Sequence, residues 1–311
     1  KTRLTTMAVI SMCDISESQY IEIPDLVSYN QYLGWYGGKI EENGPFMDSF
    51  HEMYPNIPIG MSEYGAEAYK LDDMLAWCEE FGSKLAPYIC DTSKYLYEAE
   101  KAGKSIMFEA QLGALRDIDF GIFPYTSSSS SNAGYACVGA GIPGSHVDRT
   151  VGIVKAYSTC VGEGPFTAEW FGDEAEQLRV AGGEYGASTG RPRRVGPIDL
   201  VATRYGCRIQ GATEVALTKL DVLSYMKEIP VCTQYEVNGE KTDDFPFTAV
   251  IDEAKPVLTT VPGWGCDISG VRKYEDLPQA ARDYVEYVEQ AIGVHISYVS
   301  VGAARDEYIQ R

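Results

Sequence analysis

The spacing of apolar residues along the chain changes near residue 70. From Leu71 to Leu85, apolar side chains recur every three or four positions, which is the period of an amphipathic helix. Acidic residues occupy the first turn of this segment and Pro87 follows its last turn, and both features are typical of helix boundaries. We therefore predict a helix over residues 71–85.

Beyond this helix, short apolar runs alternate with helical patterns, which predicts an α/β sheet with crossover helices. The strand candidates are residues 105–108, 215–220, 230–237 and 294–301. The last helix is predicted to have Asp276 as its cap and Pro278 in its first turn, and to end before Gly293. Its predicted apolar face consists of Leu277, Ala281, Tyr284, Val285 and Val288.

Composition narrows the class of protein. The chain has 311 residues, of which 45% are hydrophobic and 23% are charged, and this is enough for one large or two ordinary domains. Its formal net charge of -19 repels phosphate, so nucleic acid and anionic membranes are not expected as partners. The sequence has no apolar run of about 18 residues and no signal peptide pattern, so we expect a cytoplasmic protein.

The eight cysteines show neither metal-site spacing nor the density of a disulfide scaffold. We interpret them as mostly buried thiols in a reducing compartment. The three histidines are far apart in the sequence. We therefore expect no metal site in this chain.

Residues 1–68 contain one candidate catalytic residue. A short apolar run ends near Glu63, which is followed by Tyr64 and Gly65. Barrel enzymes place catalytic carboxylates at the ends of such strands. The segment resembles the family 2 glycoside hydrolases, the β-galactosidase and β-glucuronidase group, and the resemblance implies a partial TIM barrel with Glu63 as nucleophile. Retaining hydrolysis needs a second carboxylate, which the family carries on an earlier strand than this sequence includes.

Three clusters beyond residue 69 carry candidate binding chemistry. In residues 218–221, an Asp can accept hydrogen bonds from the N1 and N2 donors of guanine while a Lys stem packs on the base; a solvated strand end is the alternative. Residues 186–194 hold three arginines, which suit carboxylate or phosphate binding; an exposed basic turn is the alternative. Residues 117–144 are typical of turns, and by composition the serine tract 127–131 is a flexible linker.

Taken together and in this order, these clusters resemble adenylosuccinate synthetase, a family that joins IMP and aspartate at the expense of GTP. The resemblance covers residues 69–311. It is carried by residues 90–93, 108–125, 155–159, 161–166, 186–194, 218–223 and 277–281. It implies an α/β sheet-and-helix body related to the P-loop NTPases.

The resemblance also implies which residues bind each substrate. The GTP residues are Lys219, Leu220, Asp221, Ser300, Val301, Gly302 and Arg193. The IMP residues are Ser127, Arg191, Gln111 and Val161. The aspartate residues are Ala187, Ser188, Thr189, Gly190, Arg191, Pro192 and Arg193. The family also implies Mg²⁺ as cofactor and a homodimer as the intact assembly.

In this family the phosphate loop, the catalytic Asp and His and the magnesium ligands belong to an amino-terminal half that this sequence does not include. We therefore expect a ligase body that lacks its amino-terminal half, preceded by a partial barrel, with a boundary between residues 68 and 69 and no activity in isolation. Leu112 stands where the family pattern has Gln, with Gln111 one place early, and Cys160 replaces an Arg. The alternatives are a glycoside hydrolase acting through Glu63 and a non-catalytic chimera with residual nucleotide binding.

Overall fold

The computed structural model describes residues 6–10, 26–31, 42–55, 59–64, 71–109, 112–186, 190–246 and 248–311. The chain forms two compact units, Lys1–Ile89 and Cys90–Arg311, and each has its own internal packing. The boundary that the sequence suggests, between residues 68 and 69, stays a prediction.

The first unit contains a parallel three-stranded sheet. Its strands are β1 (Thr6–Ile10), β2 (Leu26–Gln31) and β3 (Ile59–Tyr64), in the order β1-β2-β3. Helix α1 (Asn43–Met53) lies in the connection between β2 and β3, as expected where neighbouring strands are parallel and need a crossover. Sequential parallel strands of this kind also build βα barrels.

Helix α2 (Leu71–Leu85) has the bounds predicted from the sequence, and Pro87 lies in the short 3₁₀-helix Ala86–Tyr88 that follows it. Its apolar stripe is open to solvent: Leu75, Phe81 and Leu85 are all exposed. The spacing of apolar residues therefore predicted the helix correctly, although the described residues of its apolar stripe are not buried.

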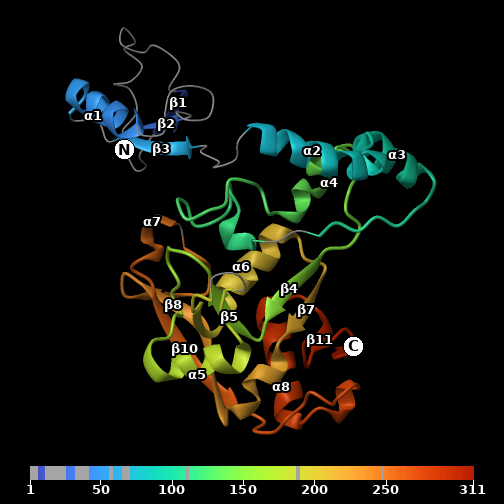
Figure 1. Ribbon diagram of the computed structural model, residues 1–311. Coiled ribbons are helices and arrows are strands. Elements are labelled where there is room, and N and C mark those ends of the chain that lie inside the picture. Colours follow the sequence, from blue (N-terminus) through green and yellow to red (C-terminus); the bar gives the residue numbers. More distant parts are fainter. Residues whose placement is uncertain are drawn as a thin grey trace. The chain divides into compact units, whose positions relative to one another are not determined.

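The second unit contains two sheets (Figure 1). In the first, β4 (Val151–Lys155), β7 (Glu214–Thr218) and β11 (Ile296–Ser300) are parallel, and β12 (Tyr308–Gln310) is antiparallel to β11. The second has the order β10-β8-β6-β5, with β9 paired to β8. Its strands are β5 (Tyr157–Cys160), β6 (Arg194–Asp199), β8 (Glu228–Val237), β9 (Glu240–Thr242) and β10 (Lys255–Pro262).

The helices of the second unit precede or connect these strands. They are α3 (Thr92–Lys101), α4 (Ala136–Gly139), α5 (Gly172–Gly182), α6 (Leu200–Gln210), α7 (Thr248–Ile251) and α8 (Gln279–Ile292). Short 3₁₀-helices cover η4 (Ala114–Arg116), η5 (Ala133–Tyr135), η6 (Leu220–Tyr225) and η7 (Tyr274–Asp276). Alternating strands and helices confirm the predicted α/β class.

The main core lies between α8 and the parallel strands. The predicted apolar face of α8 is confirmed, because Leu277, Ala281, Tyr284, Val285 and Val288 are all buried. They belong to one cluster with buried residues of β7 and β11. A smaller cluster joins α6 and β8 and contains Ala168, Val201, Cys232, Tyr235 and Ile251.

Three sequence predictions of elements need correction. Residues 105–108 are not a strand, because no described strand pairs with them and Met107 is 88% exposed. The run 215–220 is a strand only as far as Thr218, since Lys219 takes a left-handed conformation with φ of 60°. Pro278, not Asp276, occupies the N-cap position of α8, and Asp276 ends η7 instead.

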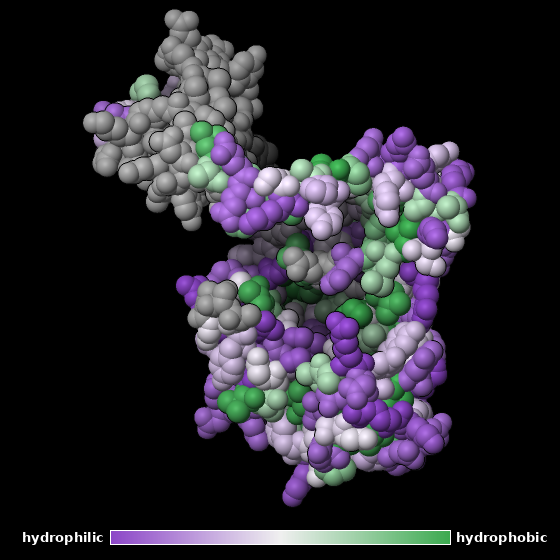
Figure 2. All heavy atoms as spheres, turned by 45° about the vertical axis from the view of Figure 1, so that its right-hand side comes forward, coloured by the Kyte–Doolittle hydropathy of each residue, from purple (hydrophilic) through white to green (hydrophobic). Residues whose placement is uncertain are grey.

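Hydrophilic residues cover most of the described surface in Figure 2, where green hydrophobic residues form small groups between purple ones. Among the described helices, none is long and apolar enough to cross a membrane.

Candidate functional site

The carboxyl ends of β4, β7 and β11 lie at one edge of the sheet, because the three strands are parallel and adjacent. Lys155 ends β4, the segment Lys219 to Asp221 follows β7, and Ser300 ends β11. Ligands of open α/β sheets bind at such an edge. The structure thus brings together the two sequence segments to which guanine recognition was assigned.

Lys219 has an unusual backbone conformation and an ammonium that donates two hydrogen bonds. Its backbone is left-handed, which is uncommon for a residue with a Cβ. Its Nζ donates to the Gly182 carbonyl (2.6 Å), at the carboxyl end of α5, and to Glu184 Oε1 (3.1 Å). Because the ammonium is occupied, the methylene stem is the part of Lys219 that is left for packing on a ligand.

Asp221 carries a buried acceptor that lacks a partner. Its Oδ1 makes no hydrogen bond to any described residue. Burial raises the pKa of Asp221, and the nearby Lys219 opposes this shift. A buried carboxylate oxygen without a donor is costly, so this position is suited to a ligand that brings N–H groups.

The basic loop forms the turn of a short hairpin. Gly186 N donates to the Arg191 carbonyl (2.8 Å) and Arg193 N donates to the Glu184 carbonyl (2.9 Å). Gly190 has φ of +64° and Pro192 pairs with Tyr185. Ala187, Ser188 and Thr189, which lie between these paired positions in the sequence, are outside the described residues, as is Gln111.

Arg193 is the second residue with an orphaned buried atom. Its Nη1 donates to Glu184 Oε2 (2.9 Å), while its Nε is buried without a partner among the described residues. A guanidinium that is anchored on one side and unsatisfied on another is suited to an anion. The two orphaned atoms in the described part of the chain, on Asp221 and Arg193, both belong to residues that sequence reasoning selected.

Glu184 links these residues and was not predicted. It is fully buried. Besides Lys219, its Oε1 accepts from Lys155 Nζ (2.9 Å) and Tyr157 OH (2.6 Å). Burial favours the protonated form, but the hydrogen bonds from Tyr157 and Lys155 lower the pKa of Glu184 to about 2. Burial also lowers the pKa of Lys155. The matched segment 155–159 was the signal that could have indicated Lys155.

The serine tract is not the flexible linker that its composition indicated. Buried Asp117 organises it: Oδ2 accepts from Ser130 Oγ (2.8 Å), Ser131 N (2.8 Å) and Asn132 N (3.1 Å), and Oδ1 accepts from Asp119 N and Phe120 N. Burial favours the neutral acid, but these bonds lower the pKa of Asp117. One carboxylate therefore fixes the loop that contains Ser127.

Arg116 positions the loop around Val161. Its Nη2 donates to the Val161 carbonyl (2.8 Å) and to Cys160 Sγ (2.9 Å), and its Nη1 donates to the Glu163 carbonyl (3.1 Å). Val161 is 70% exposed, so its side chain is available to a ligand. Ser127 N donates to the Arg116 carbonyl (2.8 Å), which connects the two predicted IMP segments.

Glu63 lies in the last part of β3, where Asn30 of β2 is its register partner. Its side chain is outside the described residues, so its surroundings do not test the nucleophile assignment.

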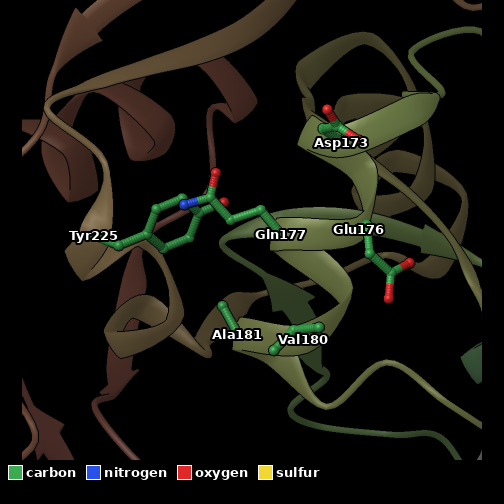
Figure 3. A pocket seen from close by; sticks show the side chains of 6 residues that line it. All are labelled: Asp173, Glu176, Gln177, Val180, Ala181 and Tyr225. Carbon is green, nitrogen blue, oxygen red and sulfur yellow. The ribbon is translucent and has the colours of Figure 1, made fainter.

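A pocket of about 460 Å³ lies on α5. Figure 3 shows Tyr225 of η6 opposite the helix residues that line it. The lining residues are Asp173, Glu176, Gln177, Val180, Ala181 and Tyr225. None of them belongs to the predicted binding residues, so we do not regard this pocket as the functional site.

The chain is thus an α/β protein with two buried, unpaired polar atoms near the edge of the sheet at which open α/β sheets bind ligands. The adenylosuccinate synthetase family profile matches residues 37–309. The chain therefore belongs to the adenylosuccinate synthetase family, which confirms the resemblance found in the sequence. The match begins before Tyr69, the predicted start of that region.

Named relatives agree. Adenylosuccinate synthetase of Bifidobacterium adolescentis is 44% identical over 260 residues, which are 83% of this chain and 58% of the relative. The Salinibacter ruber protein is 45% identical over 79% of this chain and 56% of its own length. The structure of fully ligated adenylosuccinate synthetase from Plasmodium falciparum has 31% identity and a TM-score of 0.74, covering 87% of this chain and 63% of that one. The chain thus spans somewhat more than half of the curated relatives.

A second, short likeness concerns a structure described as an FMN-binding β-glucuronidase from Facaelibacterium prausnitzii L2-6. It covers 22% of this chain at 51% identity, with a TM-score of 0.20.

Proposed function

We propose that the protein acts in a GTP-dependent ligase reaction of the adenylosuccinate synthetase type, which joins IMP and aspartate in purine nucleotide biosynthesis. The observation that carries this proposal is the buried Asp221 Oδ1, which lacks a donor. The N1–H and exocyclic amine of guanine are donors with the spacing of a carboxylate. Lys219, Leu220, Ser300, Val301 and Gly302 complete the proposed guanine site.

The remaining assignments follow the family. We assign IMP to Ser127, Gln111, Val161 and Arg191, and aspartate to residues 187–193. The orphaned Nε of Arg193 supports an anion at this place. We further propose a homodimer and a cytoplasmic location, the latter supported by the seven described cysteines, all of which are free.

Magnesium is implied by the family. Among the described residues, however, no group of three or more His, Cys, Asp or Glu side chains could hold a metal ion. We therefore assign no Mg²⁺ ligand among the described residues and no step to the ion.

The test is calorimetric titration of GTP and xanthosine triphosphate. Asp221→Asn offers one acceptor and one NH2 donor, which opposes the guanine amine but suits the xanthine C2 carbonyl. We expect GTP binding to weaken about ten- to a hundredfold, because about 1.5–3 kcal/mol of charge-assisted hydrogen bonding is lost, and xanthosine triphosphate binding to strengthen. Lys219→Ala should weaken both. Equal GTP affinities of wild type and Asp221→Asn would contradict the guanine site.

A second candidate concerns residues 1–68. The sequential parallel order β1-β2-β3 and the position of Glu63 near the carboxyl end of β3 favour a fragment of a glycoside hydrolase barrel. Hydrolysis of an aryl β-galactoside or β-glucuronide that is lost in Glu63→Gln would support hydrolytic activity through Glu63, and no hydrolysis by the wild type would exclude that activity. The third candidate, a non-catalytic chimera, predicts GTP binding without adenylosuccinate formation.

A further inference from the structure

Glu184 stands at the junction of three separate segments. It follows the carboxyl end of α5, its cationic partner Lys155 ends β4, and Lys219 follows β7. Its third cationic partner, Arg193, lies on the returning side of the hairpin. Tyr157, at the start of β5, is the one neutral donor. One carboxylate thus connects the guanine segment to the basic loop.

The two carboxylate oxygens of Glu184 bind different cations, and each of these cations belongs to one of the two proposed ligand contacts. Oε1 holds the ammonium of Lys219, and Oε2 holds Nη1 of Arg193. Glu184 thereby orients Lys219 through its terminal ammonium and Arg193 through one nitrogen of its guanidinium. What is left to a ligand is the stem of Lys219 and the orphaned Nε of Arg193.

Charge makes this arrangement depend on Glu184. Three cations surround a single buried carboxylate whose side chain is 0% exposed. Like charges at this spacing repel one another in a medium of low dielectric constant. Without the carboxylate, Lys155, Lys219 and Arg193 would separate, and each cation would turn toward solvent or another acceptor.

We propose that Glu184 is a positioning residue that couples guanine recognition by Lys219 and Asp221 to anion binding by Arg193. This inference rests on the proposed function, because it assumes that those residues bind a guanine nucleotide. Glu184 does not touch the ligand itself. A purely structural role, in which it only balances buried charge, is the competing explanation.

A double-mutant cycle on the full chain separates the two explanations, with GTP affinity measured by calorimetric titration. Lys219→Met and Glu184→Gln should each weaken GTP at least about tenfold. If Glu184 acts through Lys219, the double variant should be no more than about threefold weaker than Glu184→Gln alone, because coupled residues are not additive. Fully multiplicative losses would overturn the positioning role.

Glu184→Asp is the second variant, and it keeps the test decisive if Glu184→Gln does not fold. Aspartate preserves the charge but is one methylene shorter, so it cannot reach Lys219 and Arg193 together. Positioning predicts weakened GTP binding in Glu184→Asp at a nearly unchanged melting temperature. Wild-type GTP affinity in Glu184→Asp would mean that only the charge matters, and the proposal would be wrong.

The matched control is Glu289→Gln. Glu289 also binds two basic side chains, Arg311 (2.8 Å) and His295 (2.9 Å), but it does so beside the amino end of β11. This variant should bind GTP as the wild type does, and an equal loss there would overturn the specific role of Glu184. Absence of GTP binding by the wild type would instead contradict the proposed function, and the coupling with it.

Discussion

Two buried carboxylates, Asp117 and Glu184, shape the polar loops of the second unit, and neither has an assigned ligand. Each collects donors that are distant in sequence: Ser131 lies 14 positions from Asp117, and Lys219 lies 35 positions from Glu184. The residues that we propose to face a ligand were all chosen from short motifs. Their supports could not be predicted in this way, because a motif shows which residues are adjacent in the chain and not which donors fold around a carboxylate.

The pKa of Glu184 predicts how stability depends on pH. It is depressed from 4.5 to about 2, so its contribution is complete above pH 4.5 and is lost as the pH falls toward 2. This shift corresponds to about 3 kcal/mol. In urea unfolding at several pH values, Glu184→Gln should lose less stability over this interval than the wild type does. Arg149 also lowers the pKa of Glu214 to about 2, but Glu214 contributes equally to the stability of the wild type and of Glu184→Gln. Parallel curves of unfolding free energy against pH for the two proteins would contradict the prediction.

At the scale of elements, the serine tract shows why local composition was misleading. Consecutive serines favour a linker only if nothing satisfies their backbone groups, and here Asp117 accepts from two successive amides, Ser131 and Asn132. The end of β7 was misjudged for a related reason. Nothing in its apolar run indicates that Lys219 turns left-handed, since that conformation depends on tertiary contacts of its side chain.

Asp117→Ala should therefore destabilise the whole segment. Five donors lose their acceptor, and each unsatisfied buried donor costs about 1–3 kcal/mol, partly relieved by water. We expect at least about 3 kcal/mol of lost unfolding free energy in urea titrations, together with faster proteolysis of residues 117–132. Asp119→Asn, at an exposed neighbour, serves as the control and should change stability by less than about 0.5 kcal/mol. Equal stability of Asp117→Ala and wild type would show that the tract is held by other contacts.

At the scale of the whole molecule, all described members of the two hydrophobic clusters belong to the second unit. The sequence could indicate a change of character near residue 70, because family resemblance and hydrophobic period change together there. It could not show where compact packing begins, which depends on contacts between distant residues.

Fragments 69–311 and 90–311 should consequently unfold at the same urea concentration as the full chain. The fluorescence of Trp170 and Trp264, which pack against the main cluster, reports the transition. Limited proteolysis of the full chain should cut near residues 66–71 and leave a fragment that starts close to Tyr69. A large fall in the midpoint of fragment 90–311, or cuts spread over residues 100–300, would show that the segment before Cys90 contributes to stability.

The shared direction of β4, β7 and β11 also bears on how such a protein can evolve. The proposed recognition residues Lys219 and Ser300 lie where the strands end, whereas Thr150 and Thr213, which are hydrogen-bonded to each other, lie where β4 and β7 begin. We expect mutations at the starting rim to change stability without touching the proposed recognition residues, whereas mutations at the finishing rim change both, because Glu184 stabilises the fold as well as holding Lys219. Natural selection can therefore adjust heat resistance at the starting rim without altering the proposed choice of base.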